Sequence, residues 1–168
     1  MIKINTAEKA YQLGQKYEQI YTGCSQCVVA ALQDSLNIRN DAIFKAATGL
    51  AAGGGASIDG SCGAYTGSVM VLSYLFGRER EYFADTAGVL LNNFELIRKL
   101  HDKFIQEYGS VICRNIQTKV FGRPYYLADT DDFEKFEKAG AHDVHCPEVV
   151  GKAARWAAEI INEVKLVP

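Results

Sequence analysis

Apolar residues recur every three to four positions along nearly the whole chain, and no sustained alternation of apolar and polar positions occurs. The first pattern predicts α-helices, whereas the second would predict strands. The helices expected from it are Thr6–Tyr21, Cys24–Leu36, Asn40–Leu50, Gly63–Phe76, Asp85–Tyr108, Ser110–Val120, Phe133–Lys138 and Cys146–Val164. We therefore expect an all-α fold, a single-domain multihelical bundle of about six to eight helices over residues 1–168.

The segment Gly63–Phe76 is apolar on nearly all sides, which is typical of a helix surrounded by other helices. We expect it to be the buried central helix of the bundle. Its Gly63, Ala64 and Gly67 are small enough to let a neighbouring backbone or a bulky prosthetic group approach closely. The preceding helix is expected to stop before Gly53-Gly54-Gly55, because consecutive glycines lose too much entropy inside a helix.

Two of the expected helices carry an apolar stripe that predicts which side chains face the core. The stripe of the first helix is Ala7, Ala10, Tyr11, Leu13, Tyr17, Ile20 and Tyr21. The stripe of the longest expected helix is Ala87, Leu90, Leu91, Phe94, Ile97, His101, Phe104, Ile105 and Tyr108. A histidine on an apolar face is more often a core residue than a ligand, so His101 is expected in the core.

Composition and charge exclude several classes of function. The chain has 168 residues, with 18 basic against 20 acidic side chains, and a nucleic-acid-binding surface would need a clustered basic excess. From Ala46 to Gly77 only Asp59 is charged, but glycines and serines interrupt this segment, so we expect no membrane span. The first 21 residues contain frequent charges and no apolar run of signal-peptide length, which predicts a cytoplasmic protein.

Four of the five cysteines fall at expected helix starts. Cys24 begins the second helix and Cys62 directly precedes the glycine-rich one. Cys113 lies in the first turn after a Ser110 cap, and Cys146 takes the N-cap position of the last helix. Unpaired backbone N–H groups and the positive end of the helix dipole stabilise a thiolate there. We therefore expect low thiol pKa values, and in the reducing cytosol such cysteines are more often metal-binding or redox-active than a disulfide framework.

The spacing of these four cysteines excludes zinc modules built from close ligand pairs, because successive members are 38, 51 and 33 positions apart. In a helical bundle, however, four helix starts can converge around a metal or an iron–sulfur centre. Cys27 lies one turn into its helix and is expected in the core, with a working CxxC pair with Cys24 as the alternative. His142 and His145 precede Cys146, and His145 is the better candidate for a ligand or proton carrier.

Four cysteine motifs follow one another in a specific order: Gly23-Cys24-Ser25-Gln26, Gly60-Ser61-Cys62-Gly63-Ala64-Tyr65-Thr66-Gly67, an isolated Cys113, and Cys146-Pro147. In this order they resemble the C_GCAxxG_C_C family of redox-active proteins, from about Ala10 to Ile161. The resemblance implies that Cys24, Cys62, Cys113 and Cys146 are the family's cysteines and that Cys27 has no counterpart. Similar domains occur in split-Soret-type cytochromes associated with an iron–sulfur centre. This chain has no CxxCH motif for haem attachment, so the resemblance does not imply a haem here.

The helix-start cysteines and this resemblance together lead us to expect a redox-active or electron-transfer protein. Its metal ligands would be Cys24, Cys62, Cys113 and Cys146, holding an iron–sulfur cluster, [2Fe–2S] in preference to [4Fe–4S], with Gly63, Ala64 and Gly67 bordering the cofactor. One alternative is a thiol–disulfide oxidoreductase or redox sensor that uses the same cysteines. Another is a non-catalytic helical module with structural zinc, bound by the four thiols or by three of them and His145. We expect an unidentified redox protein as the partner, and the many small residues leave a homodimer open.

Overall fold

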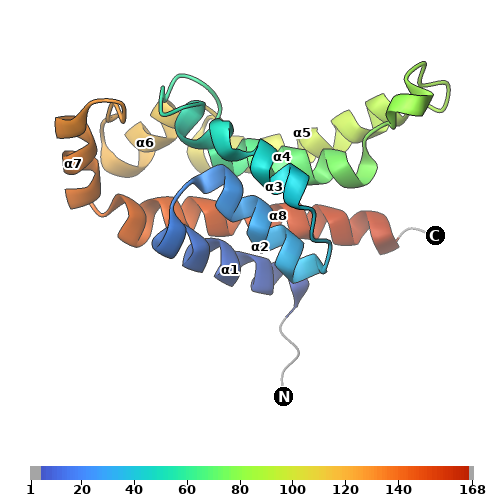
Figure 1. The fold of residues 1–168 in the computed structure, drawn as a ribbon, viewed down its shortest axis with the longest axis horizontal. Helices are drawn as coiled ribbons and strands as arrows, with labels where there is room; N and C mark the ends of the chain where they lie inside the picture. The colour runs from blue at the N-terminus through green and yellow to red at the C-terminus, as the bar shows by residue number, and fades with distance from the viewer. Residues whose placement is uncertain (1–4, 167–168) are drawn as a thin grey trace.

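The computed structural model describes residues 5–166. Within this range the chain forms eight α-helices and no β-strand (Figure 1). The helices are α1 (Thr6–Tyr21), α2 (Cys24–Leu36), α3 (Asp41–Ala46), α4 (Gly63–Phe76), α5 (Val89–Tyr108), α6 (Cys113–Phe121), α7 (Thr130–Lys138) and α8 (Cys146–Leu166). Short 3₁₀ turns lie at Thr48–Gly53 and Arg80–Tyr82, and a π-helical turn at Ala141–His145 leads into α8. The predicted all-α fold is confirmed. Residues 1–4, part of the segment used to predict the compartment, lie outside the described residues.

Most helix ends lie within three residues of the predicted ones: α6 begins at Cys113 instead of Ser110, and α7 begins at Thr130 instead of Phe133. Two ends differ by more. The third expected helix ends at Ala46, and a 3₁₀ turn follows in which the Thr48 hydroxyl donates to the carbonyl of Lys45 (2.7 Å). The helix expected from Asp85 begins only at Val89, after Gly88 as the N-cap in the left-handed conformation (φ 70°). The Asp85 carboxylate, from outside the helix, accepts the N–H groups of Val89 and Leu90. As a result α5 has 20 residues, and the longest helix is α8 with 21.

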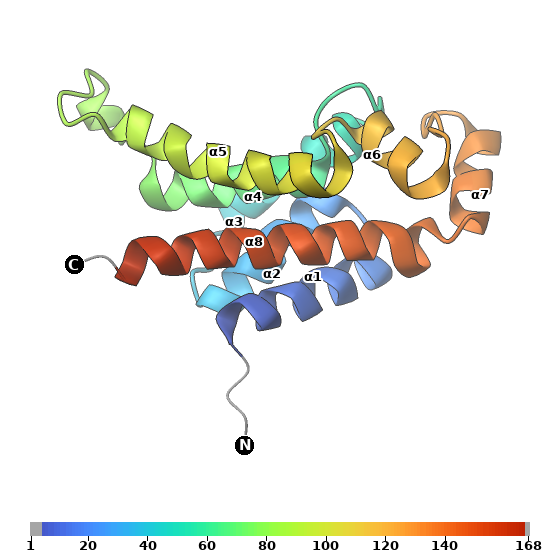
Figure 2. The same cartoon turned by 180° about the vertical axis from the view of Figure 1, so that it is seen from behind.

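The last helix, α8, is the axis of the bundle. Helices α1, α2, α4 and α5 all pack against it (Figures 1 and 2). Its inward face is buried and includes Val149, Val150, Ala153, Ala154, Ala157, Ile160 and Ile161. The closest neighbour is the antiparallel helix α1, which it meets at two glycines: a Cβ added to Gly14 would lie 3.1 Å from the Cα of Gly151. Small residues on this axis therefore let its neighbours approach closely.

Helix α4 packs against α2, α5 and α8, in agreement with its predicted central position. It approaches α2 most closely at Gly67, where an added Cβ would lie 2.5 Å from the carbonyl oxygen of Ser25. Gly63 is equally close to the same helix, because a Cβ there would lie 2.5 Å from the Cys24 Sγ atom. These two glycines thus let the two helices come together and place the start of α2 beside the start of α4.

The buried faces of α1 and α5 are only partly those predicted. Members of the expected stripes that are exposed are Ile20 and Tyr21 of α1 and Leu91, Phe94 and Ile105 of α5. The residues that the two helices bury are Ala7, Ala10, Gly14 and Glu18, and Asn93, Leu100, Phe104 and Tyr108. The first turns of α5 extend beyond the other helices (Figure 1). There α4 covers the side that carries Asn93, whose Oδ1 atom accepts from the Ser73 hydroxyl (3.3 Å), and leaves Leu91 and Phe94 exposed.

The expected core position of His101 is wrong. Its side chain is 43% exposed, and its Nδ1 atom lies 3.4 Å from the Oδ1 atom of Asp102. The buried face of α5 includes Leu100 and Phe104, and the Phe104 ring packs against Tyr65 of α4 and Trp156 of α8. His101 lies at the margin of this face, one helical turn from Phe104.

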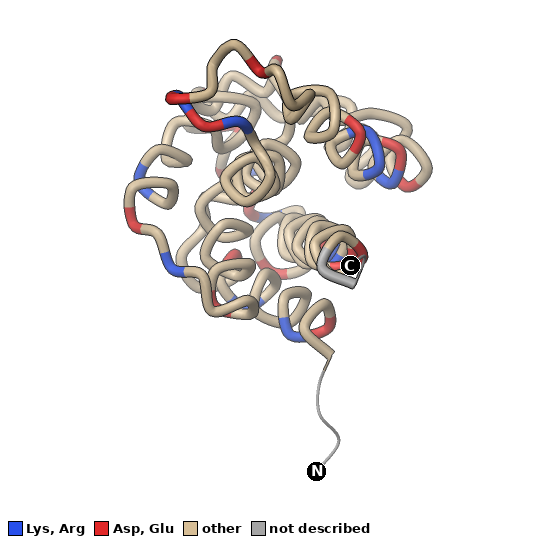
Figure 3. Tube along the Cα trace, turned by 90° about the vertical axis from the view of Figure 1, so that its right-hand side faces the viewer, with Lys and Arg blue, Asp and Glu red and all other residues tan. Residues whose placement is uncertain are grey.

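Basic and acidic residues are interspersed along the outer turns of the backbone (Figure 3). Some of them join neighbouring helices, as Arg155 of α8 does with Glu8 of α1 (2.6 Å) and Lys103 of α5 with Glu159 of α8 (3.1 Å). Within residues 5–166, none of the helices is both long enough and apolar enough to span a bilayer.

Candidate functional site

The four cysteines predicted at helix starts lie there, with one difference in detail. Cys24 is the first residue of α2, Cys62 is the N-cap of α4, and Cys113 is the first residue of α6. Cys146 begins α8 but is not its N-cap, because its backbone is helical and its N–H donates to the carbonyl of Ala141 in the π-helical turn. The helical segment that contains Cys146 therefore starts one turn earlier, and the dipole end lies away from this thiol.

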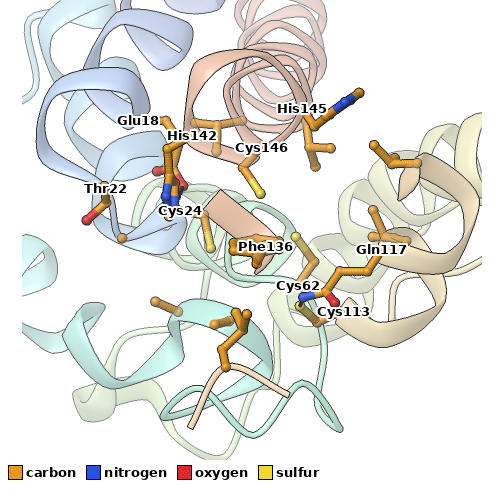
Figure 4. Close-up of a pocket in the computed structure, with 18 of the residues that line it drawn as sticks. Glu18, Thr22, Cys24, Cys62, Cys113, Gln117, Phe136, His142, His145 and Cys146 are labelled. Carbon is orange, nitrogen blue, oxygen red and sulfur yellow. Dashed lines mark hydrogen bonds and ion pairs between the residues drawn. The ribbon is translucent and has the colours of Figure 1, made fainter. Parts of the chain in front are cut away.

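All four cysteines line one cavity of about 210 Å³ (Figure 4). Most of its wall is apolar and comes from α6, α7, α8 and the loop between α6 and α7. The larger apolar side chains of the wall are Ile116, Val120, Phe121, Leu127, Phe133, Phe136, Val149 and Val150. The polar side chains besides the thiols are Glu18, Thr22, Gln117, His142 and His145, and no lysine or arginine lines the cavity. The sequence distances between the cysteines are thus bridged by the fold.

A short antiparallel pairing of two loops places Cys62 next to Cys113. The N–H of Cys62 donates to the carbonyl of Val111 (2.8 Å), and the N–H of Cys113 donates to the carbonyl of Gly60 (3.0 Å). A third bond joins the N–H of Arg114 to the carbonyl of Ile58 (3.0 Å). The glycine-rich loop before α4 is therefore fastened to the start of α6, and the two cysteines share one rigid support.

The other contacts at the cavity are made by side chains. The Cys24 thiol lies within hydrogen-bonding reach of the Cys62 thiol. On the opposite side, the Gln117 amide approaches the Cys113 Sγ atom (3.8 Å), while its Oε1 atom accepts the N–H of Tyr125 (2.7 Å). Gln117 thus ties the Cys113 side of the cavity to the loop that closes it.

The expectation of low thiol pKa values is wrong for three of these cysteines. The contact with Cys62, burial and the charge of Cys62 raise the pKa of Cys24 well above its ordinary value. Burial, followed by the nearby Glu18, raises the pKa of Cys146 well above its ordinary value, and burial raises the pKa of Cys113 to about 12. A helix dipole contributes only about 1 kcal/mol, and removing a thiolate from water in a cavity without a cation costs more than that.

The donor set of the cavity fits a cluster better than a single ion. In a tetrahedral zinc site the sulfurs lie about 2.3 Å from the ion and hence about 3.8 Å from one another. Among the residues that the structure describes, no three His, Cys, Asp or Glu side chains gather closely enough to hold a metal ion. A cavity of about 210 Å³ is larger than the engineered cavity of about 150 Å³ that binds benzene. Four thiols around such a volume suit a group of several atoms, and four cysteines are the usual ligands of [2Fe–2S] and [4Fe–4S] clusters.

Sequence reasoning missed Glu18 as a residue of the cavity wall and ranked His142, which also lines the cavity, below His145. Glu18 of α1 is almost fully buried, and its Oε2 atom has no hydrogen-bond partner. Its Oε1 atom lies 3.7 Å from the Nε2 atom of His142, whose Nδ1 atom is 2.5 Å from the Oε1 atom of Glu137. The available signal is that Glu18 continues the small-residue row Ala7, Ala10 and Gly14 at helical spacing, which places a carboxylate on a buried face.

The preferred histidine candidate, His145, also lines the cavity, where its ring packs edge-on against Phe121 with 4.8 Å between the centroids. The fifth cysteine, Cys27, is buried in the core as expected. Its thiol donates to the carbonyl of Thr22 (3.0 Å). Cys27 is thereby set apart from the four cysteines that line the cavity.

The small residues Gly63, Ala64 and Gly67, expected beside the cofactor, are all buried at the start of α4. They do not belong to the residues that line the cavity. Their contribution to the site is indirect, because Gly63 and Gly67 allow α2 to approach α4 and so bring Cys24 to Cys62.

Comparison with known proteins gave one match. The family model described as "Putative redox-active protein (C_GCAxxG_C_C)" matches residues 22–160, a range that contains all four cysteines of the cavity. The family's name writes its second motif as GCAxxG, whereas this chain has Cys62-Gly63-Ala64 followed by Gly67. Comparisons with curated proteins and with solved structures gave no significant match. Because the match covers most of the chain and all four cysteines of the cavity, this protein belongs to the C_GCAxxG_C_C family of redox-active proteins.

Proposed function

We propose that Cys24, Cys62, Cys113 and Cys146 ligate an iron–sulfur cluster and that the protein transfers electrons. The observation that carries this proposal is the convergence of four thiols from four separate helix starts on one cavity. The local sequence around each cysteine does not require the four thiols to converge, because each of the four helices also packs against other neighbours. Membership of a redox-active family supports the same class of chemistry.

The surroundings of the thiols support metal ligation over simple thiol chemistry. Buried thiols with raised pKa values and no lysine or arginine in the cavity are poor nucleophiles. Iron can replace their protons directly, because a metal ion supplies the positive charge that the cavity lacks. The apolar wall would keep water away from the bound centre. The reduction potential of the centre depends on how completely water is excluded from it.

Four cysteines ligate both [2Fe–2S] and [4Fe–4S] clusters, and of the two we propose [2Fe–2S]. The cavity of about 210 Å³ has room for such a group between the four thiols. When bound, such a cluster supplies one-electron chemistry. The protein would hold the cluster and exclude water from it. We propose that the electron partner is an electron-carrier protein, which would remain outside the bundle.

Thiol–disulfide exchange is the second candidate, and one observation favours it. The thiols of Cys24 and Cys62 are within hydrogen-bonding reach of each other, so they could form a disulfide. Their oxidation would release two electrons and two protons to a disulfide acceptor, which would become two thiols. This candidate gives Cys113 and Cys146 no necessary role, and for that reason we place it second.

Cysteine variants test the proposal, with Cys27 as the matched control. Each of Cys24→Ser, Cys62→Ser, Cys113→Ser and Cys146→Ser is expected to remove most of the bound iron and sulfide from anaerobically purified protein. Cys27→Ser keeps a donor for the carbonyl of Thr22 and is expected to retain both. Visible spectra with iron, sulfide and zinc analysis provide the measurement.

Three results would contradict this assignment. The first is equal loss of iron in Cys27→Ser, and the second is iron content that is unchanged in Cys113→Ser and Cys146→Ser. The third is zinc in place of iron, which would support the structural zinc module. A colourless protein in which Cys24 and Cys62 alone lose thiol titre reversibly on oxidation would support the disulfide candidate.

A further inference from the structure

A buried carboxylate without a full set of partners faces the cysteine cavity. Glu18 is 1% exposed, and its Oε2 atom has no hydrogen-bond partner among the described residues. The carboxylate lines the cavity together with the four thiols (Figure 4). A glutamate is rarely fully buried unless it is paired, and leaving one of its oxygens without a hydrogen-bond partner is unfavourable. A carboxylate that is buried at such a cost in stability indicates a function at this position.

The carboxylate is joined to the surface by two more titratable groups. The Oε1 atom of Glu18 lies 3.7 Å from the Nε2 atom of His142, and the Nδ1 atom of His142 lies 2.5 Å from the Oε1 atom of Glu137. The side chain of Glu137 is 39% exposed, that of His142 is 18% exposed, and that of Glu18 is 2% exposed. Exposure thus falls stepwise from the surface of α7 to the cavity.

None of the titratable groups that face Glu18 among the described residues carries a permanent positive charge. Cys27 faces it from α2, His142 from the π-helical turn and Glu137 from α7. Cys24 and Cys146 are the nearest of the predicted ligands, and no hydrogen bond joins either of them to Glu18 in the part of the chain that the structure describes. Only His142 can bring a positive charge to the carboxylate, and it does so by carrying a proton.

We propose that Glu137, His142 and Glu18 form a proton-transfer line from solvent to the cysteine cavity, and that Glu18 takes up one proton when the cavity's redox centre accepts one electron. This inference rests on the proposed function, because it requires a one-electron centre in the cavity. The physical reason is that one added negative charge is costly in an apolar cavity without a cation. A proton placed on a nearby carboxylate restores the charge of the cavity.

The step balances in atoms and charge. A one-electron donor, such as a reduced electron-carrier protein, gives one electron to the centre. Glu137 passes a proton from solvent to the Nδ1 atom of His142, and the Nε2–H of His142 then gives its proton to the Oε1 atom of Glu18 through one water molecule, because the two atoms are 3.7 Å apart. Glu18 becomes a neutral carboxylic acid, Glu137 is a carboxylate again, His142 is left as its Nδ1–H tautomer until the reverse transfer restores the Nε2–H form, and the net charge of the cavity is unchanged. Reoxidation sends the proton out by the same atoms.

The dependence of the reduction potential on pH tests the line. In the loaded wild-type protein, the ratio of oxidised to reduced centre at a fixed potential should change tenfold per pH unit, which is about 59 mV for one electron. In Glu18→Gln the potential should be independent of pH over the same range. Glu8→Gln is the matched control, because Glu8 lies on the same helix but pairs with Arg155 at the surface, and it should keep the wild-type slope.

An infrared measurement checks the site of protonation without relying on the folding of a variant. The reduced-minus-oxidised difference spectrum of the wild type should gain the carbonyl band of a protonated carboxylic acid, which shifts in D₂O. The band should be absent in Glu18→Gln and present in Glu8→Gln. A wild-type spectrum without this band would overturn the inference even if Glu18→Gln failed to fold.

The outer end of the line has a separate test. Glu137→Gln should leave the equilibrium slope unchanged and slow the proton uptake that follows mixing with dithionite, measured with a pH-indicator dye by stopped flow. A wild-type potential that does not depend on pH, or an equal slope in Glu18→Gln, would overturn the line while the cluster itself is still detected by iron and sulfide. A wild-type protein that binds no iron and no sulfide would instead overturn the proposed function, and the line with it.

Discussion

At the scale of single residues, the site consists of cysteine thiols buried in an apolar cavity, an environment that disfavours their thiolate form. Burial raises the pKa of Cys113 to about 12 and also raises the pKa of Cys146, while the contact with Cys62, followed by burial, raises the pKa of Cys24. The sequence could predict that these cysteines share a type of position, the helix start, because that follows from local pattern. It could not predict that burial outweighs the helix dipole, because burial depends on which segments close over the cavity.

The pKa of Glu18, raised by burial, gives a prediction for the metal-free protein. The folded state holds this proton to higher pH than the unfolded chain does. The stability that the proton confers is therefore complete below the unfolded pKa and is lost as the pH rises through the folded pKa. Glu18→Gln should raise the free energy of unfolding at pH 8 by on the order of 1–3 kcal/mol and bring no gain at pH 4.

Urea denaturation of the reduced, metal-free protein at the two pH values measures this difference. Glu8→Gln serves as the control, because its ion pair with Arg155 is partly exposed and should contribute less than about 1 kcal/mol at either pH. An equal effect of Glu18→Gln at pH 4 and pH 8 would show that Glu18 does not titrate as described.

At the scale of elements, the bounds of α1, α2 and α4 could be predicted closely because glycine and capping residues act locally. The start of α5 could not, since Asp85 caps the N–H groups of residues four and five positions later. Nor could the buried stripe of α5, because α4 and α8 select which face they cover. The same limit applies to Glu18, which meets the cavity only after α1 docks on α8.

The approach of α2 to α4 gives a prediction at this scale. Gly67→Ala would place a Cβ atom 2.5 Å from the carbonyl oxygen of Ser25, and such overpacking costs about 1–3 kcal/mol. Because the two helices must separate, Cys24 should also move away from Cys62, so we expect less bound iron together with a lower urea midpoint.

Gly49→Ala is the matched control for this substitution, since an added Cβ at Gly49 meets no atom within 4 Å. It should keep the iron content and the urea midpoint of the wild type. If Gly67→Ala behaved like Gly49→Ala in both measurements, the close contact of α2 with α4 would not be what positions Cys24.

At the scale of the whole molecule, the cavity joins parts of the chain that are distant in sequence. The starts of α2, α4, α6 and α8 meet there, and α7 covers it from one side through Phe133 and Phe136. A group bound by all four thiols would therefore link the N-terminal helices to the C-terminal ones. Ligands that bind only the folded state stabilise it by mass action.

Removal of the bound centre should accordingly lower the unfolding temperature. We expect protein treated anaerobically with an iron chelator to melt several degrees below the loaded protein, since a change of about 1 kcal/mol shifts the midpoint by about 2–4 °C in a chain of this size. Circular dichroism at 222 nm follows the transition. Identical melting with and without chelator would show that the four helix starts are not tied together through a metal centre.

The measurement that tests the central claim most directly is the iron and acid-labile sulfide content of anaerobically purified wild-type protein, taken with its visible spectrum. A [2Fe–2S] cluster on the four cysteines predicts a brown protein with about two irons and two sulfides per chain. A colourless protein that contains neither, before and after anaerobic reconstitution with iron and sulfide, would contradict it.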